Sequence, residues 1–209
     1  RKEFGYKDLS KHKLLDTFCN QPYINVVASL YSFIPKNLPL KLTKKLLKTY
    51  TDYLKHNPSN HDKLEFEVAF TTWVPEFKTE FKKRFNNYKF TQNEILKIEK
   101  ELKIITNKAF HRYDKDIKLS KKMYDRRNQI ISSNKSEINK ALQLLKDCKN
   151  FGTLSFAHAA RAGFVSVTIL KSFVYNKILS KNRYDQFMQS ISTVSSEFDE
   201  SFSNTKKIL

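Results

Sequence analysis

Glycine and proline are scarce in this sequence, with only 3 Gly and 5 Pro among 209 residues. Glycine-rich nucleotide-binding folds and many-turned β-sandwiches need these residues at their turns, so the scarcity argues against both and favours long helices. Aromatic residues are plentiful, with 17 Phe and 10 Tyr, which excludes ordinary disorder. A chain of this length can bury a substantial core, and we expect one domain over residues 1–209.

Cysteine is also rare. Cys19 and Cys148 are the only two, and neither belongs to a Cys-x-x-Cys pair. The sequence therefore predicts no disulfide framework and two small buried side chains. None of the five histidines pairs with another His or Cys at metal spacing, so we expect no metal site. Phosphate-loop, dinucleotide, metalloprotease and nucleophile-elbow motifs are all missing, which indicates that this chain is not a complete enzyme by itself.

Long apolar runs are missing as well. No run approaches the roughly 18 residues of a membrane-spanning helix, and the start does not resemble a signal peptide. The first residue is Arg1 rather than Met. We therefore expect a cytoplasmic protein, and a piece excised from a longer chain.

Positive charge is abundant, with a formal net charge of +18. Lysine accounts for 32 of the 39 basic residues and is spread over nearly every segment. Dispersed lysine with little arginine favours a solvated surface, and we expect neither nucleic acid nor a membrane as a partner. Two alternatives stay open: an acidic neighbouring domain, or a basic helical module that binds nucleic acid. A purely structural linker between domains is a further alternative.

Two segments have the pattern of β-strands. Ile24–Ser32 is β-branched, aromatic or small and lies between two prolines, and Lys63–Thr71 alternates apolar and polar residues. We expect these two strands to pair across the helix that separates them. The predicted fold is α+β and mostly α-helical, with long helices packed against one small antiparallel sheet.

The remaining segments have helical periodicity. Thr91 and Glu94 match a capping box that opens a long helix, and Gly152 has the position of a residue that ends one. The helices are expected at residues 39–56, 76–88, 91–113, about 117–149 with an interruption near 132–134, 155–177 and about 181–203.

The first candidate site is a polar face of the predicted strands. Glu65 and Glu67, with Lys63, would lie opposite Ser29 and Tyr31. This face is either an ordinary solvent-facing edge or a polar floor for a small zwitterion, with the carboxylates on an ammonium and the hydroxyls on a carboxylate.

The second candidate site opens the most apolar helix. Thr153, His158 and Arg161 lie in the stretch GTLSFAHAARAGF, residues 152–164. A buried cation is costly unless it is paired. Arg161 could bind a carboxylate or phosphate through two hydrogen bonds, helped by free N–H groups at the helix N-terminus, or it could pair with Glu65 or Glu67. His158 is either a packed histidine or an acid–base group.

Three stretches together resemble the central region of proteins related to phosphoenolpyruvate synthase and pyruvate, phosphate dikinase. They are FGYKDLSKHKLLDTFCNQPYINVVASLYSFIP (4–35), HDKLEFEVAFT (61–71) and FGTLSFAHAARAGFVSVTILKSFVYNKILS (151–180). Within that family they are most similar to the L-glutamine kinases of capsular phosphoramidate biosynthesis. The family motifs usually read closer to QPYIDVR and GTLPFAxLAR. This chain departs from them at Asn25, Val27, Ser155 and the pair His158–Ala159, whereas it keeps Arg161.

The resemblance implies a role in phosphoryl transfer. The whole enzyme would use ATP and Mg²⁺, bound mainly outside this chain, to phosphorylate a histidine on a mobile domain. That phosphohistidine would then react with an acceptor bound here, L-glutamine by the closest similarity, leaving AMP and phosphate. The partners would be an ATP-grasp domain and a phosphohistidine domain of the same protein. The acceptor-binding residues would be Arg161, Thr153, Ser29, Glu65, Glu67 and Tyr31.

Overall fold

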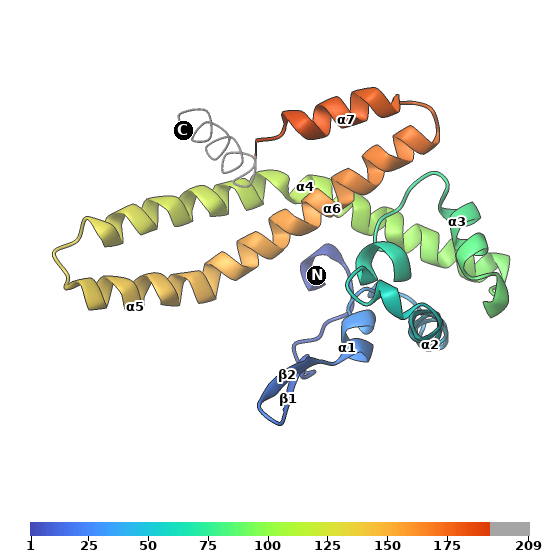
Figure 1. The fold of residues 1–209 in the computed structure, drawn as a ribbon, viewed down its shortest axis with the longest axis horizontal. Coiled ribbons are helices and arrows are strands. Elements are labelled where there is room, and N and C mark those ends of the chain that lie inside the picture. The colour runs from blue at the N-terminus through green and yellow to red at the C-terminus, as the bar shows by residue number, and fades with distance from the viewer. Residues whose placement is uncertain (193–209) are drawn as a thin grey trace, which may run out of the picture. The chain divides into compact units, whose positions relative to one another are not determined.

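The computed structural model describes residues 1–192 and is mostly helical, with one two-stranded antiparallel sheet, as the composition predicts (Figure 1). The chain divides into two compact units, residues 1–166 and 167–209. All the candidate site residues belong to the first unit. Helix α6 (Thr153–Tyr175) continues from the first unit into the second, which also holds α7 (Lys181–Ser190).

The sheet is a hairpin of β1 (Leu15–Phe18) and β2 (Gln21–Ile24), with Leu15 opposite Ile24 and Phe18 opposite Gln21. Its two-residue tip, Cys19 and Asn20, has φ angles of 49° and 60°, the left-handed values that a tight hairpin turn requires. The predicted location of the sheet was wrong, because β2 ends at Ile24, where the first predicted strand begins. The predicted burial of the cysteines was wrong too, since Cys19 and Cys148 are both exposed.

The segment predicted as the first strand forms the short helix α1 (Val26–Tyr31). Asn25 caps it: its side-chain oxygen accepts a hydrogen bond of 3.0 Å from the backbone N–H of Ala28. Leu30 and Phe33 are then buried in the core. A local cap and tertiary burial together outweigh the β preference of valine and tyrosine, which depends strongly on context.

The segment predicted as the second strand forms a single π turn, η3 (Leu64–Val68), closed by a hydrogen bond of 2.8 Å from Ala69 N to Leu64 O. Val68, Ala69 and Phe70 are all buried. Three consecutive buried residues do not fit a strand with one solvated face, since neighbouring side chains of a strand point to opposite sides.

Helix α2 (Leu40–His56) confirms the helix predicted at 39–56. The segment predicted at 76–88 forms α3 (Phe77–Arg84) and then the short turn η4 (Asn86–Tyr88). Helix α4 (Gln92–Ile131) begins at the predicted capping box, in which both reciprocal hydrogen bonds between Thr91 and Glu94 are present. It runs for 40 residues, so the predicted separation near residue 115 was wrong. The helix ends before Ser132, at the predicted interruption.

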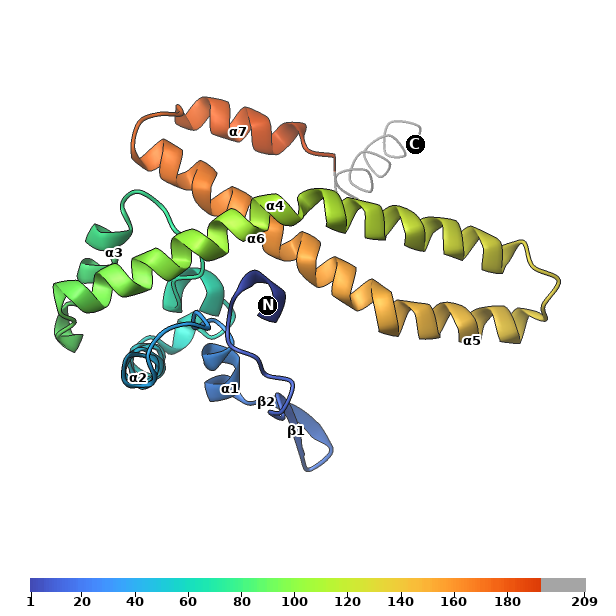
Figure 2. The ribbon, with the colours of Figure 1, turned by 180° about the vertical axis from the view of Figure 1, so that it is seen from behind.

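Helix α5 (Glu137–Asp147) joins α6 through a π turn, η5 (Cys148–Gly152). The backbone stays helical through Thr153, so the prediction that Gly152 ends a helix was wrong. Helix α7 agrees with the start of the last predicted helix but ends at Ser190, since Ile191 is extended. Residues 193–203 of that prediction lie outside the described residues. Figures 1 and 2 show α5 and the first part of α6 alongside α4 within the first unit.

The continuous helix from Glu137 to Tyr175 is more apolar than the sequence analysis recognised. Among the described residues it is the one helix with an 18-residue window of mean hydropathy 1.2, and 17% of that window is buried. By length and composition alone it could cross a membrane, although core helices of soluble proteins meet the same criterion.

Phenylalanine forms the centre of the core, where α2 and α3 and the segment around Phe70 meet the N-terminal half of α4. The ring centroids of Phe81 lie 5.1 Å from Phe85 and 5.0 Å from Phe90, in edge-to-face pairs. Such pairs add stability beyond the area that they bury. The abundance of phenylalanine in the sequence is thus explained by this cluster.

Replacing Phe81 with alanine should lower the free energy of unfolding by about 3–5 kcal/mol, because the side chain is 1% exposed and its loss leaves a cavity. The matched control is Phe156→Ala in α6, where the ring is 75% exposed and the cost should stay below about 1 kcal/mol. Denaturant unfolding followed by circular dichroism measures both. Equal costs would contradict this description of the core.

Candidate functional site

Arg161 is a buried cation on α6. Its side chain is only 5% exposed, and its Nη2 lies 2.5 Å from Oε2 of Glu65 on η3. The structure therefore contains the Arg161–Glu65 ion pair that the sequence left open. The pair joins residues 96 positions apart, and this is how the π turn is held against α6.

Arg1 is a second cation on the same carboxylate. Its Nη2 lies 3.2 Å from Oε1 of Glu65, its Nη1 donates to the hydroxyl of Ser32, and its guanidinium stacks 3.9 Å from the ring of Phe33. Burial lowers the pKa of the Arg1 guanidinium; the charge of Glu65 opposes this shift and the charge of Arg161 adds to it. The sequence analysis missed Arg1 and Ser32, because nothing in the local sequence connects them to residue 65.

Aromatic rings surround the Arg161 guanidinium. Its central carbon is 5.5 Å from the ring of Tyr6, 5.7 Å from Phe33 and 5.8 Å from Phe164. These rings stabilise a cation through their electron-rich faces and exclude water from it. The Tyr6 hydroxyl donates to the carbonyl of Thr71, and burial raises the pKa of Tyr6 to about 12.

The cluster has more donors and more positive charge than its one carboxylate can satisfy. Nε and Nη1 of Arg161 are buried without a hydrogen-bond partner among the described residues, and so is Oε2 of Glu65 despite its short contact with Nη2. Two guanidinium groups share one carboxylate, which leaves one uncompensated positive charge. Unpaired buried donors are uncommon in folded proteins, and an anion would satisfy these donors and the excess positive charge together.

His158 belongs to a separate, neighbouring cluster. Its ring is 2% exposed; Nδ1 lies 2.8 Å from Nη2 of Arg112 and 3.1 Å from Oδ1 of Asp116, and the Phe4 ring packs edge-on at 5.5 Å. Arg112 also donates to Glu3 at 2.6 Å. Burial lowers the pKa of Arg112, but the hydrogen bonds that it donates to Glu3 and Asp116 outweigh this effect, so its pKa is raised overall. Nδ1 can either accept from Arg112 or donate to Asp116, and in both cases His158 is a buried histidine whose Nδ1 is engaged within this cluster.

The other predicted site residues do not join Arg161. Thr153 is exposed and donates to the carbonyl of Lys149 at 2.8 Å within a continuous helix, so the expected free N–H groups at a helix N-terminus do not exist there. Ser29 and Tyr31 lie on α1, and Tyr31 contacts the His12 ring, 6.0 Å away. Glu67 is exposed. Because neither predicted strand forms, the expected polar strand face was wrong.

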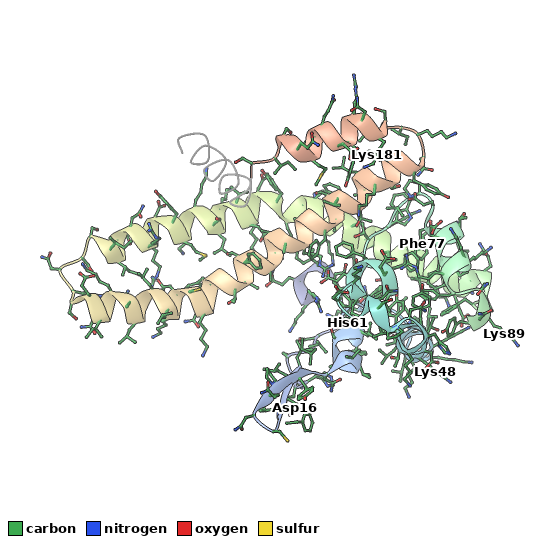
Figure 3. All side chains as sticks on the ribbon, in the orientation of Figure 1. Asp16, Lys48, His61, Phe77, Lys89 and Lys181 are labelled. Carbon is green, nitrogen blue, oxygen red and sulfur yellow. The ribbon has the colours of Figure 1, made fainter. Side chains whose placement is uncertain are left out.

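Three separate stretches of the sequence meet at the Arg161 cluster. Tyr6 and Phe33 come from the first stretch that carries the family resemblance, Glu65 from the second, and Arg161 from the third. The rings of Phe66 and Phe164 add an edge-to-face contact at 5.0 Å. Figure 3 shows the labelled His61, which precedes η3, among crowded side chains. Within residues 1–192, no group of three His, Cys, Asp or Glu side chains could hold a metal ion.

No protein-family model matches this chain, and searches of curated proteins and of solved structures find no similar protein.

The two partners of the central ion pair should differ in their effect on stability. Glu65→Gln should cost about 3 kcal/mol or more, because it leaves two guanidinium groups together without a counterion. Arg161→Met should cost less, since Glu65 keeps Arg1 as its partner. Denaturant unfolding of both variants measures the difference.

A surface pair provides the control. Asp185→Asn breaks the pair with Lys181, in which the two side chains are 44% and 67% exposed, and should cost below about 1 kcal/mol. If Arg161→Met proves costlier than Glu65→Gln, the charge imbalance described here is incorrect.

Raising the pH should destabilise the fold through Tyr6. Its folded pKa of about 12 exceeds the ordinary value of 10.0, so its contribution is complete below about pH 10 and is lost as the pH rises toward 12. The loss is on the order of 2 kcal/mol. When unfolding is measured across this pH range, the free energy of unfolding should fall less for Tyr6→Phe than for the unmodified protein. Tyr113→Phe, at a 63% exposed ring, should behave like the unmodified protein.

Proposed function

We propose that this chain is the acceptor-binding part of an ATP-dependent phosphotransferase similar to phosphoenolpyruvate synthase and pyruvate, phosphate dikinase. One observation carries the proposal. The three stretches that resemble this family converge on one buried cluster, in which Arg161 has two unpaired nitrogens and the positive charge exceeds the negative. Positioning and charge neutralisation are the main tasks of a protein in phosphoryl transfer, and such a cluster suits both.

In the proposed reaction, ATP, water and the acceptor give AMP, phosphate and the phosphorylated acceptor. A histidine on another domain carries the phosphoryl group, and ATP and Mg²⁺ bind mainly outside this chain. Arg161 binds either the carboxylate of the acceptor or the arriving phosphoryl group, through the planar fork of its guanidinium. L-Glutamine is the favoured acceptor, by the resemblance, and the reaction is cytoplasmic.

The remaining residues of the region have supporting roles. Tyr6, Phe33 and Phe164 keep the Arg161 guanidinium dry, which strengthens its attraction for an anion. His158 has a packing role in the neighbouring cluster, since the contacts of its Nδ1 are to Arg112 and Asp116. The lysine-rich surface would face the domain that carries the phosphohistidine, and neither nucleic acid nor membrane takes part.

Two departures from the family motifs agree with this role. Asn25 replaces an aspartate but caps α1, and the two residues are equally good helix caps. Ser155 replaces a proline within a backbone that is helical from Glu137 onward, where a proline would remove a hydrogen bond and clash with the preceding turn. Neither Asn25 nor Ser155 is among the residues that contact Arg161.

Arg161→Lys should separate the two half-reactions of the complete enzyme. Phosphohistidine formation from ATP should be unchanged, because that chemistry lies in other domains. Transfer to L-glutamine should fall by about 100-fold or more, because an ammonium cannot reproduce two parallel hydrogen bonds to a developing charge. The two products are measured side by side, with a melting curve for each variant.

The control for this experiment is Arg127→Lys, at an exposed arginine of α4, which should leave both half-reactions unchanged. Normal transfer by a folded Arg161→Lys enzyme would limit Arg161 to a structural ion pair. An equal loss of both half-reactions would also contradict the assignment of Arg161 to the acceptor step.

A further inference from the structure

We infer that Glu65 is a resident carboxylate that a small anionic ligand displaces from Arg161 and Arg1, so that this ion pair acts as the gate of an anion site. The inference deepens the proposed function and rests on it for the identity of the natural ligand. The class of ligand follows from the chemistry of the site: a carboxylate or a phosphate group, with at least two oxygens available to a guanidinium.

The hydrogen-bonding capacity of Arg161 supports the inference first. A guanidinium has five N–H donors. Glu65 contacts Nη2, whereas Nε and Nη1 are covered and unpaired among the described residues. An anion with two oxygens could bond Nε together with a terminal nitrogen, which is the usual bidentate geometry. Glu65 does not achieve this geometry, so an incoming anion could form bonds to Arg161 that Glu65 leaves unmade.

The balance of charge supports it second. Arg1 and Arg161 together bring two positive charges against the single negative charge of Glu65. When a ligand anion enters and Glu65 turns away, the two cations keep a counterion. The arriving negative charge is therefore stabilised, and Arg1, with Ser32 as its partner, is a second ligand-binding residue.

The exposure of the three side chains gives the route. Arg161 is 5% exposed, whereas Glu65 is 19% and Arg1 is 33% exposed. A ligand from solvent therefore meets Glu65 and Arg1 before Arg161. Glu65 lies on the single π turn η3, a local geometry that often occurs at functional sites. Moving its partly exposed carboxylate into water is far less costly than moving the buried guanidinium.

The test is anion binding by the whole chain, with inorganic phosphate and acetate as probes and chloride at matched ionic strength as the baseline. If Glu65 occupies Arg161 at least nine-tenths of the time, removing its charge should strengthen phosphate binding by about 10-fold or more. Titration calorimetry should show this gain for Glu65→Gln, and phosphate should raise the melting temperature of that variant more than that of the unmodified protein.

Two further variants make the result specific. Glu94→Gln removes one negative charge from the ion pair with Lys45 and still supports the capping box, so its phosphate affinity should equal that of the unmodified protein. Arg161→Lys, added to Glu65→Gln, should abolish the gain. Should Glu65→Gln fail to fold, Glu65→Asp carries the test: its shorter side chain is a weaker competitor, and an intermediate gain is expected.

A folded Glu65→Gln or Glu65→Asp variant with no gain in phosphate or acetate binding would overturn the inference and leave Glu65 as a structural partner. A gain that survives Arg161→Lys would overturn it as well. The proposed function and the anion gate can fail independently. If Glu65→Gln gains phosphate affinity as expected, but Arg161→Lys transfers the phosphoryl group normally in the complete enzyme, the anion gate stands and the proposed function fails.

Discussion

The burial of the Arg161 guanidinium is the constraint on which the site depends. A cation that is 5% exposed needs a carboxylate and a dry surround, and of these only the ring of Phe164 comes from a residue near it in the sequence. Glu65 comes from a π turn, and Tyr6 and Phe33 come from the N-terminal segment. Placing this one charge thus requires three distant stretches of chain to meet.

The surroundings of Arg161 explain local features that are otherwise unusual. The π turn at Leu64–Val68 directs Glu65 toward α6 and buries Val68 in the core. A regular strand could also bury alternate residues, but it could not bury the neighbours Val68 and Ala69 on the same side. The turn therefore serves the core and the ion pair together. Tyr6 connects the two, because its hydroxyl bonds the carbonyl of Thr71 while its ring faces Arg161.

Two neighbouring clusters on α6 differ in their electrostatic balance. Around His158, Arg112 has two carboxylate partners, Glu3 and Asp116, although its Nε is buried without a partner in the described structure. Around Arg161, two arginines share one carboxylate, so the cluster is positive, and two nitrogens are without partners in the described structure. A cluster whose arginine is matched by carboxylates stabilises the packing of α4 against α6, whereas a cluster with excess positive charge suits an anion from outside. This contrast favours Arg161 over His158 as the residue that meets a ligand.

The sequence by itself determined the mostly helical class, the helix at Leu40–His56, the capped start of α4 at Thr91 and the break after Ile131. These features depend on periodicity and caps, which act within a few residues. Only the tertiary structure decided that 26–31 is helical, that 64–68 is a π turn and that the strands lie at 15–24, because burial in the core there outweighs β preference. It also decided that Arg1 and Ser32 join Glu65 and Arg161. Ion pairs between distant residues leave no pattern in the sequence, since each depends on how the intervening helices pack.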